Sequence, residues 1–399
     1  MLIPASPVAV HYGALDTRIL QLQGRPGRWN VRWATSIPAQ GKARHAHVVD
    51  VLRKRRKSPR WKGKDASVGM SGDGVAMNLV PIDASNRQRL GQILQDTAAR
   101  SLEDVEGVVY RVLSLSESIP DNAGMREELL LLSTGQSEIR RCMEATQALH
   151  LRPVGLEMNA FPTARALEKA YGSEHSSWGF LHLGFQHALL ALVRDGEIRF
   201  LKPLQIDGQR LLESLQTTVA HLPAAGAEAA TGLPGEVDVM DLLAAGGGES
   251  SSPTPTGAAA NAEVSPEGGS IATAQEPQSG NPVEDPMPKL LEKIRRCAAT
   301  HAANMLSGLR RESEVLAQEV KACERHFVNR NEGATLKRLY LTGFGASLPE
   351  VDQALASALQ KEVLPAAPFS SLGIQAPAEV LEEEALWCSA LGLALRVYS

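Results

Sequence analysis

Apolar and polar residues alternate with a period of two in two groups of short segments, one at the start of the chain and one in its middle. Such alternation predicts half-buried β-strands, and turn residues separate the segments. The first group comprises Val8 to Gly13, Asp16 to Gln23 and Asn30 to Ile37. The second comprises Trp178 to Leu183, His187 to Arg194 and Ile198 to Ile206, with Asp195-Gly196 as a tight hairpin turn. We therefore expect two antiparallel meanders.

Helical spacing of apolar residues appears in further segments. We expect helices at His45 to Lys57, Leu90 to Arg100, Ser137 to Leu149, Ala160 to Ala170, Gly208 to His221, Lys289 to Val328 with a break near Gly308, Leu348 to Gln360 and Glu382 to Val397. Additional strands are expected at Val108 to Ser114, Glu128 to Ser133, Val154 to Met158, Leu336 to Thr342 and near Pro368 to Leu372. Ala66 to Ser71 and Gly74 to Val80 are predicted to pair as a hairpin around Gly72-Asp73-Gly74.

The two meanders resemble each other in sequence. Val10-His11-Tyr12-Gly13 precedes Leu20-Gln21-Leu22, and Leu181-His182-Leu183-Gly184 similarly precedes Leu190-Ala191-Leu192. Internal similarity of this kind indicates a duplicated supersecondary unit. We therefore expect two lobes that are copies of one design.

A low-complexity segment interrupts the second half of the chain. From Pro223 to Pro288 the residues are mostly Ala, Gly, Ser, Pro, Thr and Glu, with almost no aromatic or β-branched side chains. Such a segment cannot bury enough apolar surface to offset its chain entropy. It is predicted to be a disordered insertion.

Composition places the protein among ordinary globular chains. Hydrophobic residues make up 43% and charged residues 22% of 399 residues, and the net charge of −4 gives no general attraction to nucleic acid. One basic patch stands out, comprising Arg53, Lys54, Arg55, Arg56, Lys57, Arg60, Lys62 and Lys64. We interpret it as a solvated loop, with contact to anionic lipid or an acidic partner as the alternative.

Cysteine usage and hydropathy predict a cytoplasmic protein. Cys142, Cys297, Cys323 and Cys388 lie far apart without a CxxC pair, so neither zinc-ligand spacing nor a disulfide framework is indicated. The N-terminal residues lack a signal-peptide pattern, and no segment approaches the roughly 18 apolar residues of a membrane span. We expect no transmembrane segment.

The order of these elements resembles the actin/Hsp70/sugar-kinase superfamily. The most specific piece is a strand, the loop Gly343-Phe344-Gly345-Ala346-Ser347 and a helix start at Leu348-Pro349, which looks like the family's adenosine-side motif. The ending Ala390 to Arg396 is similar to the family's closing helix. Within the superfamily the chain resembles the PilM-like proteins of type IV pilus assembly, with FtsA and the cytoplasmic part of GspL as relatives.

This resemblance implies an α/β fold of two actin/Hsp70-like lobes, each ribonuclease H-like, with a small inserted subdomain. The expected division is a first lobe at 1–66 and 150–175, a subdomain at 67–149, a second lobe at 176–222 and 289–399, and the disordered insertion at 223–288.

The positions that match the family's phosphate loops have lost their acids. Family members carry Asp-x-Gly turns whose carboxylates hold hydrated magnesium and orient the attacking water. Here the matching stretches are His11-Tyr12-Gly13-Ala14 and His182-Leu183-Gly184-Phe185. Imidazole is a poor magnesium ligand, Ala14 removes a hydroxyl, and Phe185 crowds the phosphate position. The resemblance therefore implies a degenerate site.

Other site positions also depart from the family. Asp207-Gly208 replaces a Gly-Gly pair, Phe344 replaces the second glycine of the adenosine motif, and Arg18 stands where a Lys is common. The degenerate nucleotide site is assigned to His11, Gly13, Ala14, Arg18, His182, Gly184, Gly208, Gly343 and Gly345. The resemblance implies ATP as the cofactor, but these changes argue against binding of ATP and of magnesium. No catalytic residue or metal ligand is assigned. Each histidine alone is interpreted as a polar strand end, while together they could bind a transition metal or bridge the lobes.

The leading hypothesis is a PilM-like scaffold and pseudo-ATPase, peripheral to the inner membrane, in type IV pilus or type II secretion-type machinery. Its implied partners are the cytoplasmic N-terminal tail of a PilN-like membrane protein and an assembly ATPase, with self-association left open. The tail is expected between the first lobe and the subdomain, in a pocket of Val68, Met70, Met77 and Leu79, which could equally be core residues. A working ATPase or sugar kinase and an FtsA-like polymerising protein are the alternatives.

Overall fold

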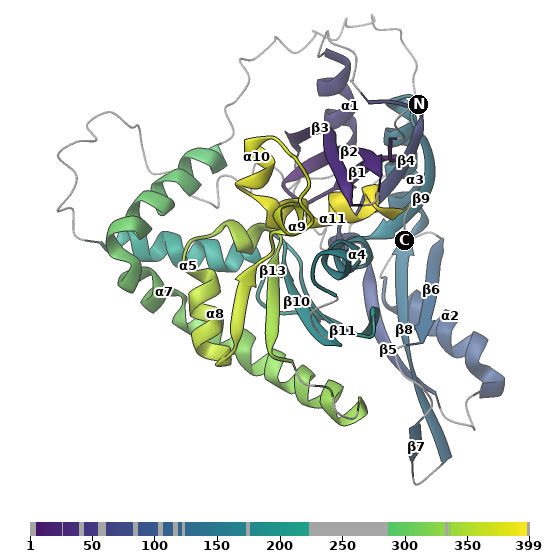
Figure 1. Cartoon of the computed structure of the whole chain (residues 1–399). Helices are drawn as coiled ribbons and strands as arrows, with labels where there is room; N and C mark the ends of the chain where they lie inside the picture. Colours follow the sequence, from purple (N-terminus) through teal and green to yellow (C-terminus); the bar gives the residue numbers. More distant parts are fainter. Residues whose placement is uncertain are drawn as a thin grey trace, which may run out of the picture.

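A computed structural model describes the chain at residues 5–25, 27–39, 44–54, 61–82, 87–102, 107–114, 119–121, 124–172, 176–222, 286–331, 334 and 336–396. In these parts the chain forms two five-stranded sheets and a smaller one, with helices packed on their faces (Figure 1). The predicted disordered insertion lies outside the described residues, except for its end at 286–288, which begins a helix. Residues 55–60 of the basic patch also lie outside them.

The first sheet begins with the expected meander. Strands β1 (Val8–Tyr12), β2 (Asp16–Arg25) and β3 (Arg28–Pro38) pair antiparallel, and β4 (Asp65–Met70) and β9 (Arg152–Met158) then add parallel strands. The strand order is β3-β2-β1-β4-β9. Every residue of β1 is buried, because this strand lies at the centre of the sheet.

The second sheet repeats this plan. Strands β10 (Ser177–Leu183), β11 (Ala188–Arg194) and β12 (Glu197–Leu204) form an antiparallel meander, and β13 (Arg338–Thr342) and β14 (Glu362–Pro365) add parallel strands. The order β12-β11-β10-β13-β14 matches that of the first sheet strand for strand. The predicted α/β fold with two duplicated lobes is therefore confirmed.

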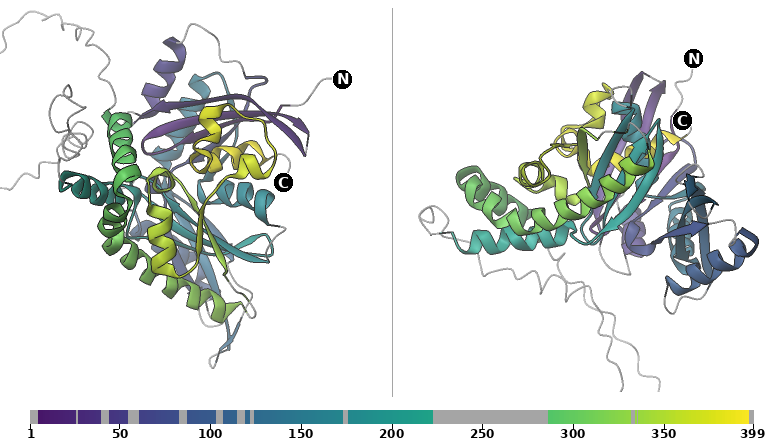
Figure 2. Two further views of the ribbon diagram at one scale, coloured as in Figure 1. Left: turned by 60° about the vertical axis from the view of Figure 1, so that its left-hand side comes forward. Right: turned by 90° about the horizontal axis from the view of Figure 1, so that it is seen from below.

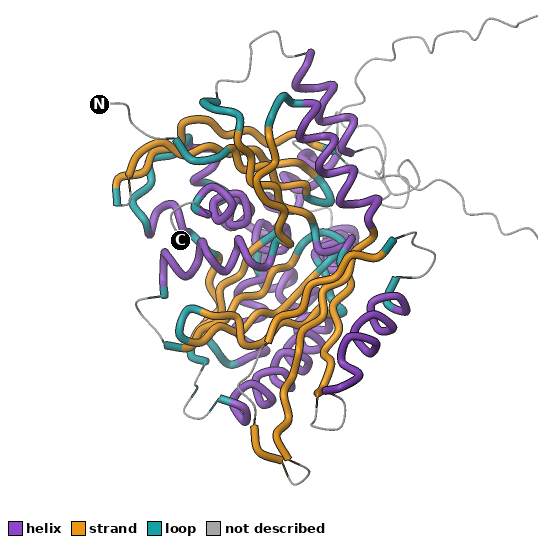
Figure 3. The backbone as a smooth tube through the Cα atoms, turned by 90° about the vertical axis from the view of Figure 1, so that its right-hand side faces the viewer, coloured by secondary structure: helices purple, strands orange, loops and turns teal. Residues whose placement is uncertain are grey.

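A third sheet is inserted after β4. It consists of β5 (Ala76–Ile82), β8 (Gly124–Gly135) and β6 (Val108–Ser114) in that order, and β7 (Ile119–Asp121) pairs with β8. Its strands lie below those of the first sheet in Figure 1, and Figure 3 shows them in orange like all other strands.

The hairpin that we predicted at the start of this insertion is wrong. Strand β4 pairs with β1 and β9 in the first sheet, while β5 pairs with β8, and a short 3₁₀ turn, η1 (Gly72–Gly74), leads from one sheet to the other. The physical reason is burial. Strand β4 is buried from Ala66 to Met70, as expected of a strand with neighbours on both edges and cover on both faces.

Two pairs of helices cover the first sheet. Helices α1 (Arg44–Lys54) and α3 (Gln136–Ala148) pack on the face that presents alternate residues of β1, starting with Val8. On the other face lie α4 (Ala160–Tyr171) and α11 (Glu384–Ala394), which pack against each other. The predicted domain division stays a prediction, but α11, which it assigns to the second lobe, packs mainly on α4 and on the first sheet.

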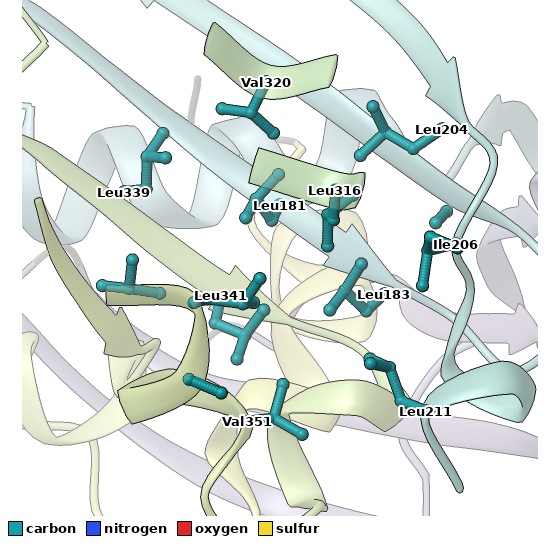
Figure 4. Packing of buried hydrophobic residues seen from close by; sticks show 14 of the residues in the cluster. Leu181, Leu183, Leu204, Ile206, Leu211, Leu316, Val320, Leu339, Leu341 and Val351 are labelled. Atoms are coloured by element: carbon teal, nitrogen blue, oxygen red, sulfur yellow. The ribbon is translucent and has the colours of Figure 1, made fainter. Parts of the chain in front are cut away.

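The second sheet is covered by α4 on one face and by three helices on the other. Helices α5 (Gly208–Ala220), α7 (Pro286–Arg330) and α8 (Val351–Leu359) share the largest apolar cluster with that sheet (Figure 4). Figure 2 shows α7 extending along this flank of the molecule. Because α4 packs on both sheets, it lies between the two lobes. Helix α2 (Leu90–Arg100) covers the third sheet.

Several local predictions for the second lobe need correction. The long helix α7 kinks at His301, where the backbone has φ −133° and ψ 37°, and not near Gly308. The strand expected near Pro368 is the short helix α9 (Pro368–Ser371), because proline suits the first helical turn. The true edge strand, β14, precedes it. No described helix combines the length and the hydropathy that a transmembrane span needs.

Candidate functional site at the junction of the lobes

Equivalent glycine turns follow the central strands of the two lobes. After β1, Gly13 N donates to Asp16 O at 2.8 Å, and a Cβ at Gly13 would lie only 2.8 Å from that oxygen. After β10, a Cβ at Gly184 would lie 2.6 Å from His187 O. Only glycine allows such a close backbone approach. The turns that the sequence repeat predicts are therefore built the same way in both lobes.

His182, at the end of β10, links the second lobe to the first. Asn159 Nδ2 donates to His182 Nε2 at 3.0 Å, and His182 Nδ1 donates to Thr342 Oγ1 at 3.1 Å. With the Asn159 amide in this orientation, the neutral imidazole carries its proton on Nδ1. Thr342 in turn donates to Leu181 O at 3.4 Å. Asn159 precedes α4 and is tied to β4 through its backbone N–H to Met70 O at 3.1 Å. The imidazole therefore uses both ring nitrogens, and its bond to Asn159 is the one that joins the two lobes.

The surroundings of His182 keep it uncharged. Burial, and after it the charges of His187, His11 and Arg18, lower the pKa of His182 from 6.5 to about 3. His11, at the matching position of the repeat, lies near enough for its charge to contribute to this pKa shift. Because both ring nitrogens of His182 are engaged in hydrogen bonds, the arrangement favours the bridging alternative over a metal bound by this histidine pair.

His187 is a third histidine at the junction. It lies three residues after Gly184, as Asp16 does after Gly13, and it reaches from the β10–β11 turn to η1. A Cβ at Gly72 would lie 2.0 Å from His187 Nε2, so the His187 ring packs directly against the backbone of η1. This contact closes the junction on the side of the third sheet.

Arg18, the positive residue of the predicted site, is already paired. Its guanidinium lies 2.6 Å from Asp16 Oδ2 and donates to Leu386 O at 2.9 Å, and it stands 5.8 Å from the ring of Trp387. These contacts tie β2 to α11. The charge that could attract a phosphate is therefore used to join two elements of the chain.

The backbone N–H groups at the N-terminus of α5 also find their acceptors within the chain. Such a helix end is a ready anion site because its first N–H groups have no helical partner. Here Gly208 N donates to Gly184 O at 2.7 Å, Gln209 N to Phe185 O at 2.9 Å, and Arg210 N to the Asp207 carboxylate at 3.1 Å. Burial raises the pKa of Asp207. These three N–H groups, which could bind a phosphate, are therefore already bonded to other parts of the chain.

The glycine loop after β13 fills the remaining space. Gly343 has φ 79°, a left-handed conformation that suits glycine, and a Cβ there would lie 2.9 Å from Leu183 O. The loop continues as η4 (Phe344–Ser347), and a Cβ at Gly345 would lie 2.6 Å from Leu183 Cβ. Phe344 packs edge-on against Phe185 at 5.3 Å between ring centroids. The loops that hold a nucleotide in the superfamily therefore contact one another here.

Two apolar residues from the first lobe complete the closure. Ala14 and Leu15, in the turn after Gly13, pack against the apolar cluster of the second lobe, which includes Phe185 and Phe344. A Cβ at Gly208 would lie 2.7 Å from Phe344 Cδ1. The junction between the lobes is thus a packed apolar contact at the place where the resemblance puts the phosphates.

A hollow of about 380 Å³ lies beside η4, on the side of α11. Its lining includes Arg295, Ser347 and three consecutive glutamates, Glu382 to Glu384. The Glu384 carboxylate accepts hydrogen bonds from two backbone amides and a serine hydroxyl at the start of α9. Excess negative charge on this rim would repel a triphosphate.

The residues that we predicted for partner binding do not form one pocket. Val68 and Met70 belong to β4 and are buried in the first lobe's core, so they cannot contact a partner, and this part of the prediction is wrong. Met77 and Leu79 lie on β5, the edge strand of the third sheet, where Met77 is partly buried and Leu79 is 40% exposed. The error follows from the mistaken hairpin.

Sequence reasoning missed Asn159, Thr342 and His187 as parts of the junction. Extending the internal repeat by three residues past each glycine would have found His187 opposite Asp16. Asn159 and Thr342 carry no such signal, because only the folded arrangement of α4 and β13 brings them to His182.

Comparison with known proteins identifies the fold. No family model matches the chain, and no curated protein matches it. Among solved structures, a PilM-PilN type IV pilus biogenesis complex matches with a TM-score of 0.63 at 15% identity, covering 99% of both chains. The ethanolamine utilization protein EutJ from Carboxydothermus hydrogenoformans matches with a TM-score of 0.47 at 14% identity. This match covers 99% of this chain and 90% of the EutJ chain.

The cytoplasmic domain of EpsL, an inner-membrane component of the Vibrio cholerae type II secretion system, matches 53% of this chain and 75% of its own at 13% identity, with a TM-score of 0.34. The first match extends over nearly the whole of both chains and shows a shared fold. The predicted resemblance to the PilM fold is confirmed at that level.

Proposed function

We propose that this chain is a PilM-like cytoplasmic scaffold of type IV pilus or type II secretion-type machinery, and that it is a pseudo-ATPase. The observation that carries the proposal is the position of Phe344, which packs against Phe185 and approaches Gly208 where nucleotide-binding loops would have to stay apart. A chain with this fold and a filled junction keeps a rigid two-lobed body. Such a body is suited to holding other proteins.

The chemistry of the junction argues against hydrolysis. Phosphoryl transfer needs magnesium held by oxygen ligands and a positioned water. At the two strand ends this chain presents His11 and His182, and burial, followed by the charges of nearby groups, lowers the pKa of His182 so that its ring stays neutral. Arg18 is paired with Asp16, so its charge is offset before any nucleotide arrives.

The proposed partner is the cytoplasmic N-terminal tail of a PilN-like inner-membrane protein. Support comes from the fold shared with a chain of a PilM-PilN complex. An extended peptide can add a strand to an exposed sheet edge, with its main chain giving affinity. Strand β5 is such an edge, and Pro81 within it fits an edge position because proline lacks a donor.

The apolar anchor of this docking edge would be Leu79. Val80 and Ile82 pack against α2, so Leu79 points to the opposite face by strand alternation. Met77 lies on the same face and contacts the cluster around α4, which leaves Leu79 as the exposed end of an apolar stripe. An assembly ATPase is the second partner of this proposal, and peripheral attachment to the inner membrane would follow from the tail.

The test is a titration of the full chain with a synthetic tail peptide from a small membrane protein encoded beside it, run with an ATP hydrolysis assay. Leu79→Asp is expected to weaken binding by at least about tenfold, because it places a charge in an apolar contact. Val315→Asp, at a similarly exposed position on α7, is the matched control and should leave binding unchanged. A tail that binds both variants equally contradicts the docking edge, and magnesium-dependent turnover contradicts the scaffold.

A further inference from the structure

Three metal-ligating side chains meet between α1 and α3, on the face of the first sheet that lies away from the lobe junction. Cys142 Sγ lies 3.5 Å from His45 Nε2, and His45 Nε2 lies 3.9 Å from Glu138 Oε1. All three donor atoms lie within 4.8 Å of one another. None of these residues belongs to the junction site.

The sequence positions explain why the three side chains converge. Glu138 and Cys142 are four residues apart in α3, so they share one face of that helix. His45 is the second residue of α1, which packs alongside α3. His45 and Cys142 are 97 residues apart in the chain, and only the packing of the two helices brings them together.

The donors are held in place by the core beneath them. The His45 ring packs against the Tyr12 ring with centroids 4.6 Å apart, and the Tyr12 hydroxyl lies 3.2 Å from Thr146 Oγ1. Thr146 also donates to Cys142 O at 2.8 Å. His45 and Cys142 are buried, so their rotamers are restricted before any ion binds.

Two of the donor separations are close to those of a tetrahedral zinc site, and the sulfur–carboxylate separation is within 4.8 Å. Zinc–sulfur bonds of about 2.3 Å and zinc–nitrogen or zinc–oxygen bonds of about 2.0–2.2 Å place tetrahedral ligands about 3.3–3.6 Å apart. The sulfur–nitrogen pair already has this spacing at 3.5 Å, and the nitrogen–oxygen pair at 3.9 Å needs only a small rotation of Glu138. A thiolate and an imidazole favour zinc over magnesium or calcium, which prefer oxygen.

We propose that His45, Glu138 and Cys142 form a site for one divalent zinc-class ion, with a water molecule as the fourth ligand. One thiolate and one carboxylate balance the charge of the ion, which a poorly hydrated site requires. The ion displaces the thiol proton of Cys142, so binding releases a proton.

Neighbouring cations set the orientation of Glu138 in this site. Arg141 Nη2 holds Glu138 Oε2 at 2.6 Å, which leaves Oε1 facing His45. Arg44 Nη2 contacts Oε1 at 3.2 Å, and the ion replaces that contact. The bound ion joins α1 to α3, and α1 ends at Lys54, within the basic patch that begins at Arg53.

Cobalt(II) and zinc(II) are the probes for this site, used on the chelator-treated full chain. We expect one cobalt per chain with a thiolate-to-cobalt charge-transfer absorption, displaced by zinc. Cys142→Ser should abolish this absorption and weaken zinc binding by at least about 100-fold, whereas Glu138→Gln should weaken it by about tenfold. Cys323→Ser, which alters another buried helical cysteine, is the matched control and should leave both the absorption and zinc binding unchanged.

Wild-type protein without the charge-transfer absorption overturns the proposal, because the three side chains then form only a hydrogen bond and ion pairs. An absorption that persists in Cys142→Ser overturns it as well. If Cys142→Ser does not fold, the wild-type spectrum and the Glu138→Gln titration still decide, since Glu138→Gln keeps the size of a side chain that is 13% exposed.

Discussion

Replacing His182 with a residue that cannot titrate should flatten the pH dependence of stability. In the folded chain burial and nearby positive groups lower the pKa of His182 from 6.5 to about 3. Between these two pKa values His182 is protonated in the unfolded chain but not in the folded chain, so the free energy of unfolding rises with pH. The contribution of neutral His182 to stability is fully present at pH values above 6.5, its pKa in the unfolded chain. This contribution is lost progressively as the pH falls from 6.5 toward 3.

The magnitude follows from linkage between these two pKa values. Lowering the pH from about 7.5 to about 5 should remove about 2 kcal/mol of unfolding free energy through His182 alone, and about 0.8 kcal/mol should already be gone near pH 6. His182→Gln keeps a side chain that can bond to Asn159 and Thr342 but has no proton to gain. The variant starts less stable at neutral pH and should lose about 2 kcal/mol less than wild type on acidification.

Urea denaturation of both proteins at matched pH values measures this difference. Other titrating groups contribute to both curves, so the comparison isolates His182. Parallel loss of stability in wild type and variant would refute the inference that a neutral imidazole joins the lobes. A variant more stable than wild type near pH 5 would support it strongly.

Further substitutions test the packing of the junction. Phe344→Ala should lower the unfolding free energy by about 3–5 kcal/mol in urea denaturation, because it empties the centre of the contact; an unchanged midpoint would contradict that role. Gly72→Ala should lower it by about 1–3 kcal/mol, since its Cβ meets His187, and His187→Ala in the same chain should recover part of the loss. Arg18→Met should lower it by about 1–3 kcal/mol, and adding Asp16→Asn should lower it by less than the sum if the ion pair is real.

Much of the architecture could be predicted from local pattern. Alternation located the two meanders, and the repeated His-x-Gly at 11–13 and 182–184 predicted equivalent turns, because a duplicated unit places equal residues at equal positions. The partner of a strand is not encoded locally, and this is why Ala66 to Ser71 was assigned to a hairpin. The structure buries this strand on both faces at the centre of a sheet, which the Gly-Asp-Gly turn signal does not reveal.

The candidate sites divide in the same way. The glycines of the junction, with His11 and His182, stand at or next to strand ends, so a motif reveals them. Asn159 and Thr342 act through long-range contacts that no spacing predicts. The trio of His45, Glu138 and Cys142 is a similar case, because α1 and α3 come from separate parts of the chain and cysteine spacing alone predicted no zinc site.

Titration calorimetry of the full chain with ATP and magnesium tests the central claim most directly. With Phe344 packed among the glycine loops and the amides of α5 already bonded, the account predicts no saturable heat. Saturable binding of one nucleotide per chain, followed by release of inorganic phosphate, would contradict it.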